Sequence, residues 1–213
     1  MRQLTSIAAC LILLFTVSCK ETKKEEKANA EAEVESSTEQ YRLVQDSVKV
    51  SFTAYKTTEK LPVGGQFKEI KITNSNGGAT PLETLNGVEF SIPVSSLFTN
   101  DATGTRDPKI LEFFFGAMND TELISGVFNV NESGESSIDV TLNGETSTIP
   151  LTQKKVSETA LAFDGVMNLE NWDALAAVSS INKACEALHT GKDGVSKTWS
   201  EVAVHAEVVV EKN

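Results

Sequence analysis

The chain has 213 residues, of which 40% are hydrophobic and 23% charged, and its formal charge is −11. This apolar content is too high for a wholly disordered chain, and one domain is expected at this length. No run reaches the roughly 18 to 20 apolar residues of a membrane-spanning helix. Acidity without a concentrated basic stripe argues against nucleic-acid binding, because neutralising phosphates requires clustered lysines and arginines.

The first 18 residues have the layout of an export signal, which is removed from the mature protein. Arg2 supplies a positive charge, residues 7–17 form an apolar core, and small residues precede Cys19. This arrangement resembles a bacterial lipobox. The resemblance implies that the Cys19 thiol is lipidated, by chains such as palmitate, and that Cys19 becomes a membrane-anchored N-terminus. An ordinary signal peptide cut nearby is the alternative.

Residues 20–40 contain four lysines, seven glutamates and no aromatic residue, and we interpret residues 19–40 as the lipidated cysteine and a charged flexible tether. By analogy with other lipoproteins, Lys20 after the cysteine favours the outer membrane, on its periplasmic or its surface side. Beyond the tether, Cys185 is the single cysteine of residues 41–213, so the fold depends on a hydrophobic core rather than on an internal disulfide.

Residues 41–213 have a rhythm of period two, which predicts half-buried strands. Apolar residues alternate with polar ones over 48–55, 88–94, 124–130, 138–142, 149–151, 161–167 and 202–210. Asn143 and Gly144 form the strongest short hairpin signal in the chain. Because one face of nearly every strand is apolar, we expect a mainly β domain built as an antiparallel barrel or sandwich.

Two segments break this alternation and predict one or two short helical segments that cap the barrel. The first is Asp107 to Met118, with Gly116 as a stop signal, and the second is Leu169 to Leu188.

Few residues point to catalysis or to a metal. Cys185 and His189 are spaced by four residues, so on a helix they would share a face, as in a thiolate–imidazole pair or part of a metal site. No third histidine or cysteine lies near them, and His205 falls on the outward phase of the last strand. The pair therefore supports an enzyme only as a minor alternative.

The segment from Asp101 to Glu112 superficially matches a calcium-binding loop. Its sixth place holds Arg106 where such a loop requires glycine, and no helix is predicted before it, so we expect no metal. The chain also lacks phosphate-binding and dinucleotide-binding motifs, so we expect no nucleotide cofactor.

Several motifs, in order along the chain, resemble the YceI-like family. They are residues 50–56 (VSFTAYK), 63–67 (VGGQF), 92–97 (IPVSSL), 105–107 (TRD) before the aromatic run 113–115, and 164–168 (DGVMN) before the valine-rich last strand. The match spans residues 41–213, although Pro108 and Lys109 stand where the family commonly has a histidine.

The resemblance implies an antiparallel lipocalin-like β-barrel without catalytic activity. It further implies an envelope lipoprotein that binds or carries an isoprenoid- or quinone-like lipid in an apolar lumen. From the inward phase of the strands we expect a set of phenylalanines to line this lumen: Phe52, Phe67, Phe90, Phe113, Phe114 and Phe128. The same large residues could instead fill the barrel, which leaves a structural or interaction lipoprotein as the alternative.

Overall fold

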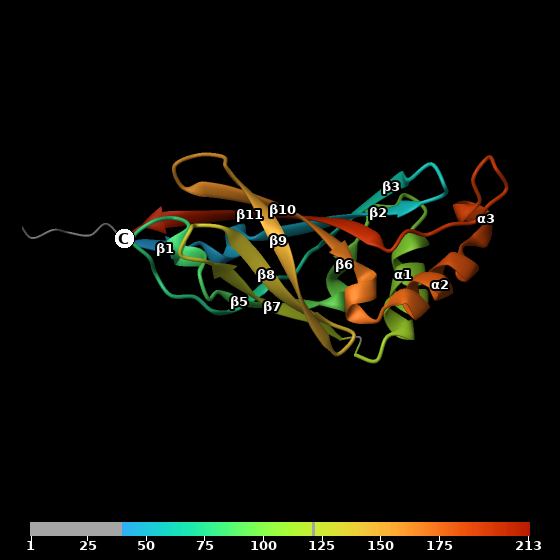
Figure 1. The fold of residues 1–213 in the computed structure, drawn as a ribbon, viewed down its shortest axis with the longest axis horizontal. Coiled ribbons are helices and arrows are strands. Elements are labelled where there is room, and N and C mark those ends of the chain that lie inside the picture. The colour runs from blue at the N-terminus through green and yellow to red at the C-terminus, as the bar shows by residue number, and fades with distance from the viewer. Residues whose placement is uncertain (1–39, 121) are drawn as a thin grey trace, which may run out of the picture. The chain divides into compact units, whose positions relative to one another are not determined.

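A computed structural model describes residues 40–120 and 122–213 (Figure 1). The predicted signal peptide, Cys19 and residues 20–39 lie outside the described residues. Within the described part of the chain, no helix is both long enough and apolar enough to cross a membrane.

The described residues form eleven strands, and every strand pair is antiparallel. Their bounds are β1 (Tyr41–Leu43), β2 (Lys49–Lys56), β3 (Leu61–Phe67), β4 (Lys71–Asn74), β5 (Glu89–Pro93), β6 (Leu97–Phe98), β7 (Leu123–Val130), β8 (Ser136–Leu142), β9 (Glu145–Lys155), β10 (Ala160–Asn168) and β11 (Glu201–Lys212). The seven strands that the alternation predicts are confirmed as β2, β5 and β7 to β11. Alternation missed β1, β4 and β6, because two to four residues are too few to establish a period. It also missed β3, whose seven residues include a proline and two glycines in place of alternating side chains.

Hydrogen bonds join the strands in the order β4-β5-β7-β8-β9-β10-β11-β2-β3-β6, and β1 pairs with β11. β9 turns the corner of this curled sheet, because its first half pairs with β8 and its second half with β10. The strands therefore form two layers, with β10, β11, β2 and β3 facing β5, β7 and β8 (Figure 1). Among the described residues, no strand pair joins the two edge strands β4 and β6. The chain passes from one edge of the sheet to the other between β3 and β4 and again between β5 and β6.

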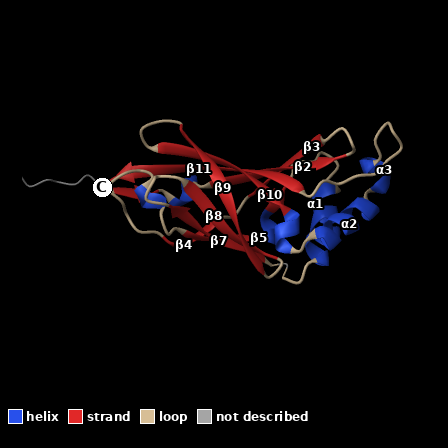
Figure 2. Ribbon diagram, viewed as in Figure 1, coloured by secondary structure: helices blue, strands red, loops and turns tan. Residues whose placement is uncertain are grey.

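Both segments predicted to be helical are helical, and they lie together at one end of the curled sheet (Figure 2). The first is α1 (Arg106–Phe113), followed by a 3-10 turn over Phe115–Ala117. The second begins with a 3-10 turn over Leu169–Trp172 and continues as α2 (Leu175–Ala184) and α3 (Glu186–His189). α1 packs against α2, so the two segments form one cap.

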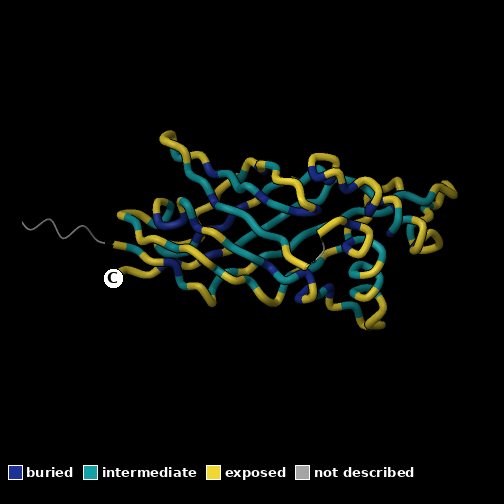
Figure 3. The backbone as a smooth tube through the Cα atoms, turned by 90° about the horizontal axis from the view of Figure 1, so that it is seen from below, coloured by how far each residue is buried: buried dark blue, intermediate teal, exposed yellow. Residues whose placement is uncertain are grey.

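Buried apolar side chains gather in two clusters. One lies between the strands and the helical cap and includes Trp172 and Phe115. The other lies toward β1 and includes Phe128 and Val210. Between them many strand residues are only half-buried (Figure 3).

Asn143 ties the helical cap to the barrel. It occupies the two-residue turn between β8 and β9 with a φ of 56°, as the hairpin signal predicted. Its buried amide donates to the carbonyl oxygens of Trp172 and Asp173 at 2.9 and 3.1 Å, and it accepts the backbone N–H of Asn119 at 2.7 Å. The Trp172 indole in turn donates to the Val140 carbonyl at 2.8 Å, so the turn and the cap support each other.

Replacing Asn143 by glycine separates its role in the β8–β9 turn from its hydrogen bonds to the helical cap. Asn143→Gly retains the positive φ but leaves three backbone groups without their side-chain partner, among them the buried carbonyl of Trp172, so we expect it to lower the free energy of unfolding by about 1–3 kcal/mol. Urea unfolding followed by circular dichroism measures this. Glu145→Ala, at the exposed neighbouring strand position, is the control and should change stability by less than about 0.5 kcal/mol. Equal stability of the two variants would contradict the proposed tie.

Candidate functional site

A cavity of about 560 Å³ lies between the two layers of the sheet and extends to the helical cap. Its wall is predominantly apolar and includes members of both buried clusters. This volume falls within the range of about 300–1,000 Å³ that is typical of small-molecule sites. The apolar residues of the barrel therefore surround an open lumen and do not fill it.

Five of the six phenylalanines that we expected in the lumen line this cavity: Phe52, Phe67, Phe90, Phe114 and Phe128. Phe113 is half-buried but is not among the lining residues, whereas Phe115 and Phe163 are. Helical phase alone does not explain the difference, because Phe113 and Phe114 both follow lining residues of α1, Lys109 and Ile110, by four positions.

Glycines on the inward side of the strands give the phenylalanine rings room to lie close to the sheet. A Cβ atom at Gly65 would stand 2.4 Å from the ring of Phe52, which is its cross-strand partner. Gly126 has the same relation to Phe90, with the ring at 2.7 Å. The rings therefore cover backbone instead of projecting across the lumen. Glycine inside an alternating strand pattern was the sequence signal for this close approach, and our sequence reasoning missed it.

The cavity opens at the helical cap, since its three exposed lining residues are all there. Thr103 and Thr105 lie in the loop before α1, and Leu188 lies on α3. The opposite end of the cavity is closed by buried residues such as Leu43 and Leu85. We refer to the open end as the mouth.

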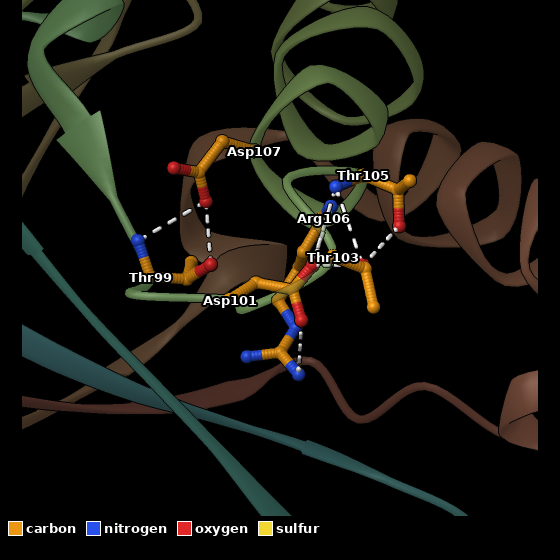
Figure 4. A network of polar contacts seen from close by, with 6 residues as sticks. All are labelled: Thr99, Asp101, Thr103, Thr105, Arg106 and Asp107. Carbon is orange, nitrogen blue, oxygen red and sulfur yellow. Dashed lines mark hydrogen bonds and ion pairs between the residues drawn. The ribbon is translucent and has the colours of Figure 1, made fainter.

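A network of polar contacts shapes one side of the mouth (Figure 4). The Asp101 carboxylate accepts hydrogen bonds from the Thr103 hydroxyl and from the backbone N–H groups of Thr105 and Arg106, and it lies 3.5 Å from the Arg106 guanidinium. The Thr103 hydrogen bond, the two backbone N–H groups and then the charge of Arg106 lower the pKa of Asp101. Asp101 is therefore ionised at neutral pH and already has partners.

The next carboxylate along the chain has a different role. Asp107 accepts hydrogen bonds from the backbone N–H and the hydroxyl of Thr99, and it thereby holds the start of α1 beside the end of β6. The segment that resembled a calcium loop thus uses both aspartates to fix its own backbone. Within the described residues, no cluster of three or more histidine, cysteine, aspartate or glutamate side chains could hold a metal ion.

Cys185 and His189 both line the cavity near the mouth. Cys185 is a buried free thiol at the junction of α2 and α3, and no hydrogen bond joins its sulfur to the imidazole in the described structure. His189 Nδ1 instead lies 2.7 Å from the Thr198 hydroxyl, which donates to the Asn182 side chain at 2.9 Å. Since that hydroxyl has one hydrogen, the imidazole carries its proton on Nδ1.

The environment of His189 keeps it uncharged. Burial, and then the nearby charge of Lys56, lower the pKa of His189 below its usual value. The second histidine lies on the outward phase of β11, as predicted, where its Nδ1 is 2.7 Å from Asp164. That hydrogen bond raises the pKa of His205.

A curled antiparallel sheet around an apolar lumen, capped by helices at its open end, defines a lipocalin-like barrel. No family model and no curated protein matches this chain. Among solved structures, the chain is similar to a polyisoprenoid-binding domain from Saccharophagus degradans implicated in plant cell wall breakdown. The identity is 13%, the TM-score is 0.56, and the match covers 81% of this chain and 98% of that one.

Two further structures are more distant. Burkholderia cenocepacia BcnA has 16% identity and a TM-score of 0.48, and the match covers 79% of this chain and 99% of that one. The Campylobacter jejuni YceI protein has 15% identity and a TM-score of 0.43, and the match covers 71% of this chain and 85% of that one. The likeness to the Saccharophagus degradans domain shows that this chain has the same fold. The lipocalin-like fold that the YceI-like resemblance implied is thus confirmed.

Enlarging an alanine distinguishes an open lumen from a packed core. Ala206 lines the cavity, whereas Ala177 is buried in the cluster beneath the cap. We expect Ala206→Phe to change the free energy of unfolding by less than about 1 kcal/mol and Ala177→Phe to cost about 1–3 kcal/mol or more, because only the second overpacks a filled site. Thermal and urea unfolding of ligand-free protein measure both. A large loss of stability in Ala206→Phe would show that the lumen is filled.

Proposed function

We propose that this protein is a lipid-anchored protein of the bacterial envelope that binds an isoprenoid-type lipid, such as a quinone-like molecule, inside its barrel. The observation that carries the proposal is the cavity of about 560 Å³ with its predominantly apolar wall. Burying apolar chain in such a wall contributes about 0.8 kcal/mol per CH₂ group, so a chain of repeating apolar units gains affinity with each unit. The cavity is lined along its length by apolar side chains and needs few polar groups to hold such a chain.

The class of ligand is supported by the fold. The Saccharophagus degradans domain, which has the same fold, is a polyisoprenoid-binding domain. A binding function also agrees with the wall of the cavity, where the cysteine and histidine that could have served catalysis are not joined to each other. We therefore propose that the protein binds or carries its ligand.

The membrane anchor and the location are proposed from the N-terminal sequence. Cys19 follows an apolar core and small residues, as in a lipobox, and Lys20 after it favours the outer membrane. An anchored barrel would hold its ligand close to the bilayer from which apolar lipids come.

Lipid binding is tested by extracting the purified protein. We expect organic solvent to release a prenyl-type lipid in roughly stoichiometric amount, identified by mass spectrometry, from the wild-type chain produced in a bacterial host. Ala206→Phe narrows the lumen and should lose most of this lipid. Ala203→Phe, on the same strand but outside the cavity wall, should retain it. Wild-type protein without any apolar lipid would favour the structural or interaction alternative.

The anchor is tested separately by changing the cysteine. Cys19→Ser should abolish incorporation of labelled palmitate and move the protein from the membrane fraction to the soluble fraction, because two acyl chains give stable anchoring. Cys185→Ser removes the buried thiol of the barrel and should leave both properties unchanged. Labelling that persists in Cys19→Ser would refute lipidation at this position.

A further inference from the structure

Exposed apolar side chains gather at the mouth of the barrel. We call residues 56–61 and 188–199 the rim, which comprises the turn between β2 and β3, the end of α3 and the loop after it, at the end opposite the C-terminus (Figure 1). Leu61, Leu188 and Val195 of the rim are 47%, 58% and 49% exposed. Single exposed apolar residues are common on soluble proteins, but several at one end of a molecule mark an interaction site.

Hydrogen bonds tie the two parts of the rim together. The Thr58 hydroxyl donates to the Asp193 carboxylate at 2.6 Å, and the backbone N–H of Thr57 donates to the Lys197 carbonyl at 2.8 Å. Lys197 in turn donates its backbone N–H to the carbonyl of His189 on α3 at 3.1 Å. The three exposed apolar side chains therefore belong to one connected surface.

The rim is basic, although the chain as a whole is acidic. It carries four lysines and two acidic residues, whereas the whole chain has 19 lysines and arginines against 30 aspartates and glutamates. Lys60 pairs with Glu201 at 2.6 Å, just outside the rim. In the part of the chain that the structure describes, Lys56, Lys192 and Lys197 form no ion pair. The charge of the protein therefore favours the approach of a negatively charged surface to the rim and opposes it elsewhere.

A half-buried tryptophan lies among these lysines. The Trp199 indole donates to the Thr57 carbonyl at 2.7 Å, and its ring has two ammonium groups close to it. The Nζ atoms of Lys60 and Lys197 lie 4.4 and 3.6 Å from the ring centre. Tryptophan and lysine together are typical of the membrane–water interface, because each has an apolar body and a polar tip.

The size of the apolar surface favours a bilayer over a protein partner. A stable protein interface buries about 800 Å² on each partner, which three side chains on separate segments do not supply. A bilayer accepts such side chains individually, because each one that enters it removes apolar area from water. Leu188 is exposed and also lines the cavity, so the apolar surface continues from the rim into the lumen.

We propose that the rim docks the barrel on the surface of an anionic lipid bilayer, with Leu61, Leu188 and Val195 inserted among the lipids and the lysines facing their head groups. This contact is separate from the lipid anchor and does not require a ligand in the lumen. It places the mouth of the barrel directly on the apolar phase.

The length of the chain before the barrel permits this orientation, although Gln40 lies at the opposite end. The chain from Cys19 to Gln40 can span at most about 70 Å. β11, the longest strand, has 12 residues and is therefore about 40 Å long. A barrel anchored through Cys19 can thus set its rim on the same bilayer that holds the anchor.

Vesicle flotation tests the docking. The mature chain with Cys19→Ser, which carries no lipid, is mixed with vesicles of phosphatidylcholine alone or of equal amounts of phosphatidylcholine and phosphatidylglycerol. We expect binding to the anionic vesicles to be at least about tenfold stronger at low salt, since each lysine near an anionic surface adds to the attraction. The difference should shrink as salt screens the charges.

Variants in the same Cys19→Ser chain assign the binding to the rim. Leu61→Ser with Val195→Ser should weaken binding to the anionic vesicles by at least about tenfold, because two inserted apolar side chains are lost. Val156→Ser with Val209→Ser removes two exposed valines outside the rim and should bind like the parent chain. Circular dichroism and urea unfolding check that both double variants are folded.

The outcomes also separate docking from lipid binding in the lumen. Neither residue of the rim variant lines the cavity, so the lipid that solvent extracts from this variant should match that from the parent chain. Equal vesicle binding by the rim variant and its control, or no vesicle binding by the parent chain, overturns the docking and leaves the lumen untouched. A dimer that light scattering detects in the parent chain but not in the rim variant would assign the rim to a second copy and overturn the bilayer as its partner.

Discussion

The open volume of this lumen depends on the close contact between phenylalanine rings and cross-strand glycines. A ring that lies on Gly65 or Gly126 covers backbone atoms and takes little of the space between the layers. The strands can therefore present large apolar side chains inward and still leave about 560 Å³ open. A β-carbon at Gly126 would in addition stand 2.1 Å from the Asp139 carbonyl oxygen, so the sheet itself requires glycine there. The cavity thus depends on residues that contribute no side chain to it.

The cap is held by an apolar cluster and, in addition, by hydrogen bonds between side chains and backbone. Asn143 and Trp172 connect the β8–β9 turn to the start of α2, and Asp107 connects α1 to β6. The wall of the cavity is predominantly apolar, whereas the loop before α1 at the mouth is held by polar contacts.

Much of the fold could be predicted from the sequence, because most strands have one apolar face. Val202 to Val210 alternate so regularly that β11 was evident, and Asn143 with Gly144 marked the hairpin between β8 and β9. The partner exchange of β9 could not be predicted, because its second half, residues 152–155, contains no apolar residue that would mark a face. At the site, strand phase placed four phenylalanines in the wall of the cavity, where the structure has them: Phe52, Phe67, Phe90 and Phe128. The three adjacent aromatic residues 113–115 cannot be assigned to a face before the end of the helix is known. Lys56 and Lys109 could not be placed in the cavity wall from the sequence, because only the fold brings β2 and α1 to the same cavity.

The first and last described residues leave the barrel from the same pole. The backbone N–H of Asn213 donates to the carbonyl of Gln40 at 2.8 Å, beside β1 and away from the helical cap (Figure 1). Anything joined to the chain at either of these residues, whether a surface, a label or a fusion partner, is therefore attached at the end opposite the entrance. The barrel presents its opening away from its point of attachment, so tethering and access to the lumen do not compete for the same part of the molecule.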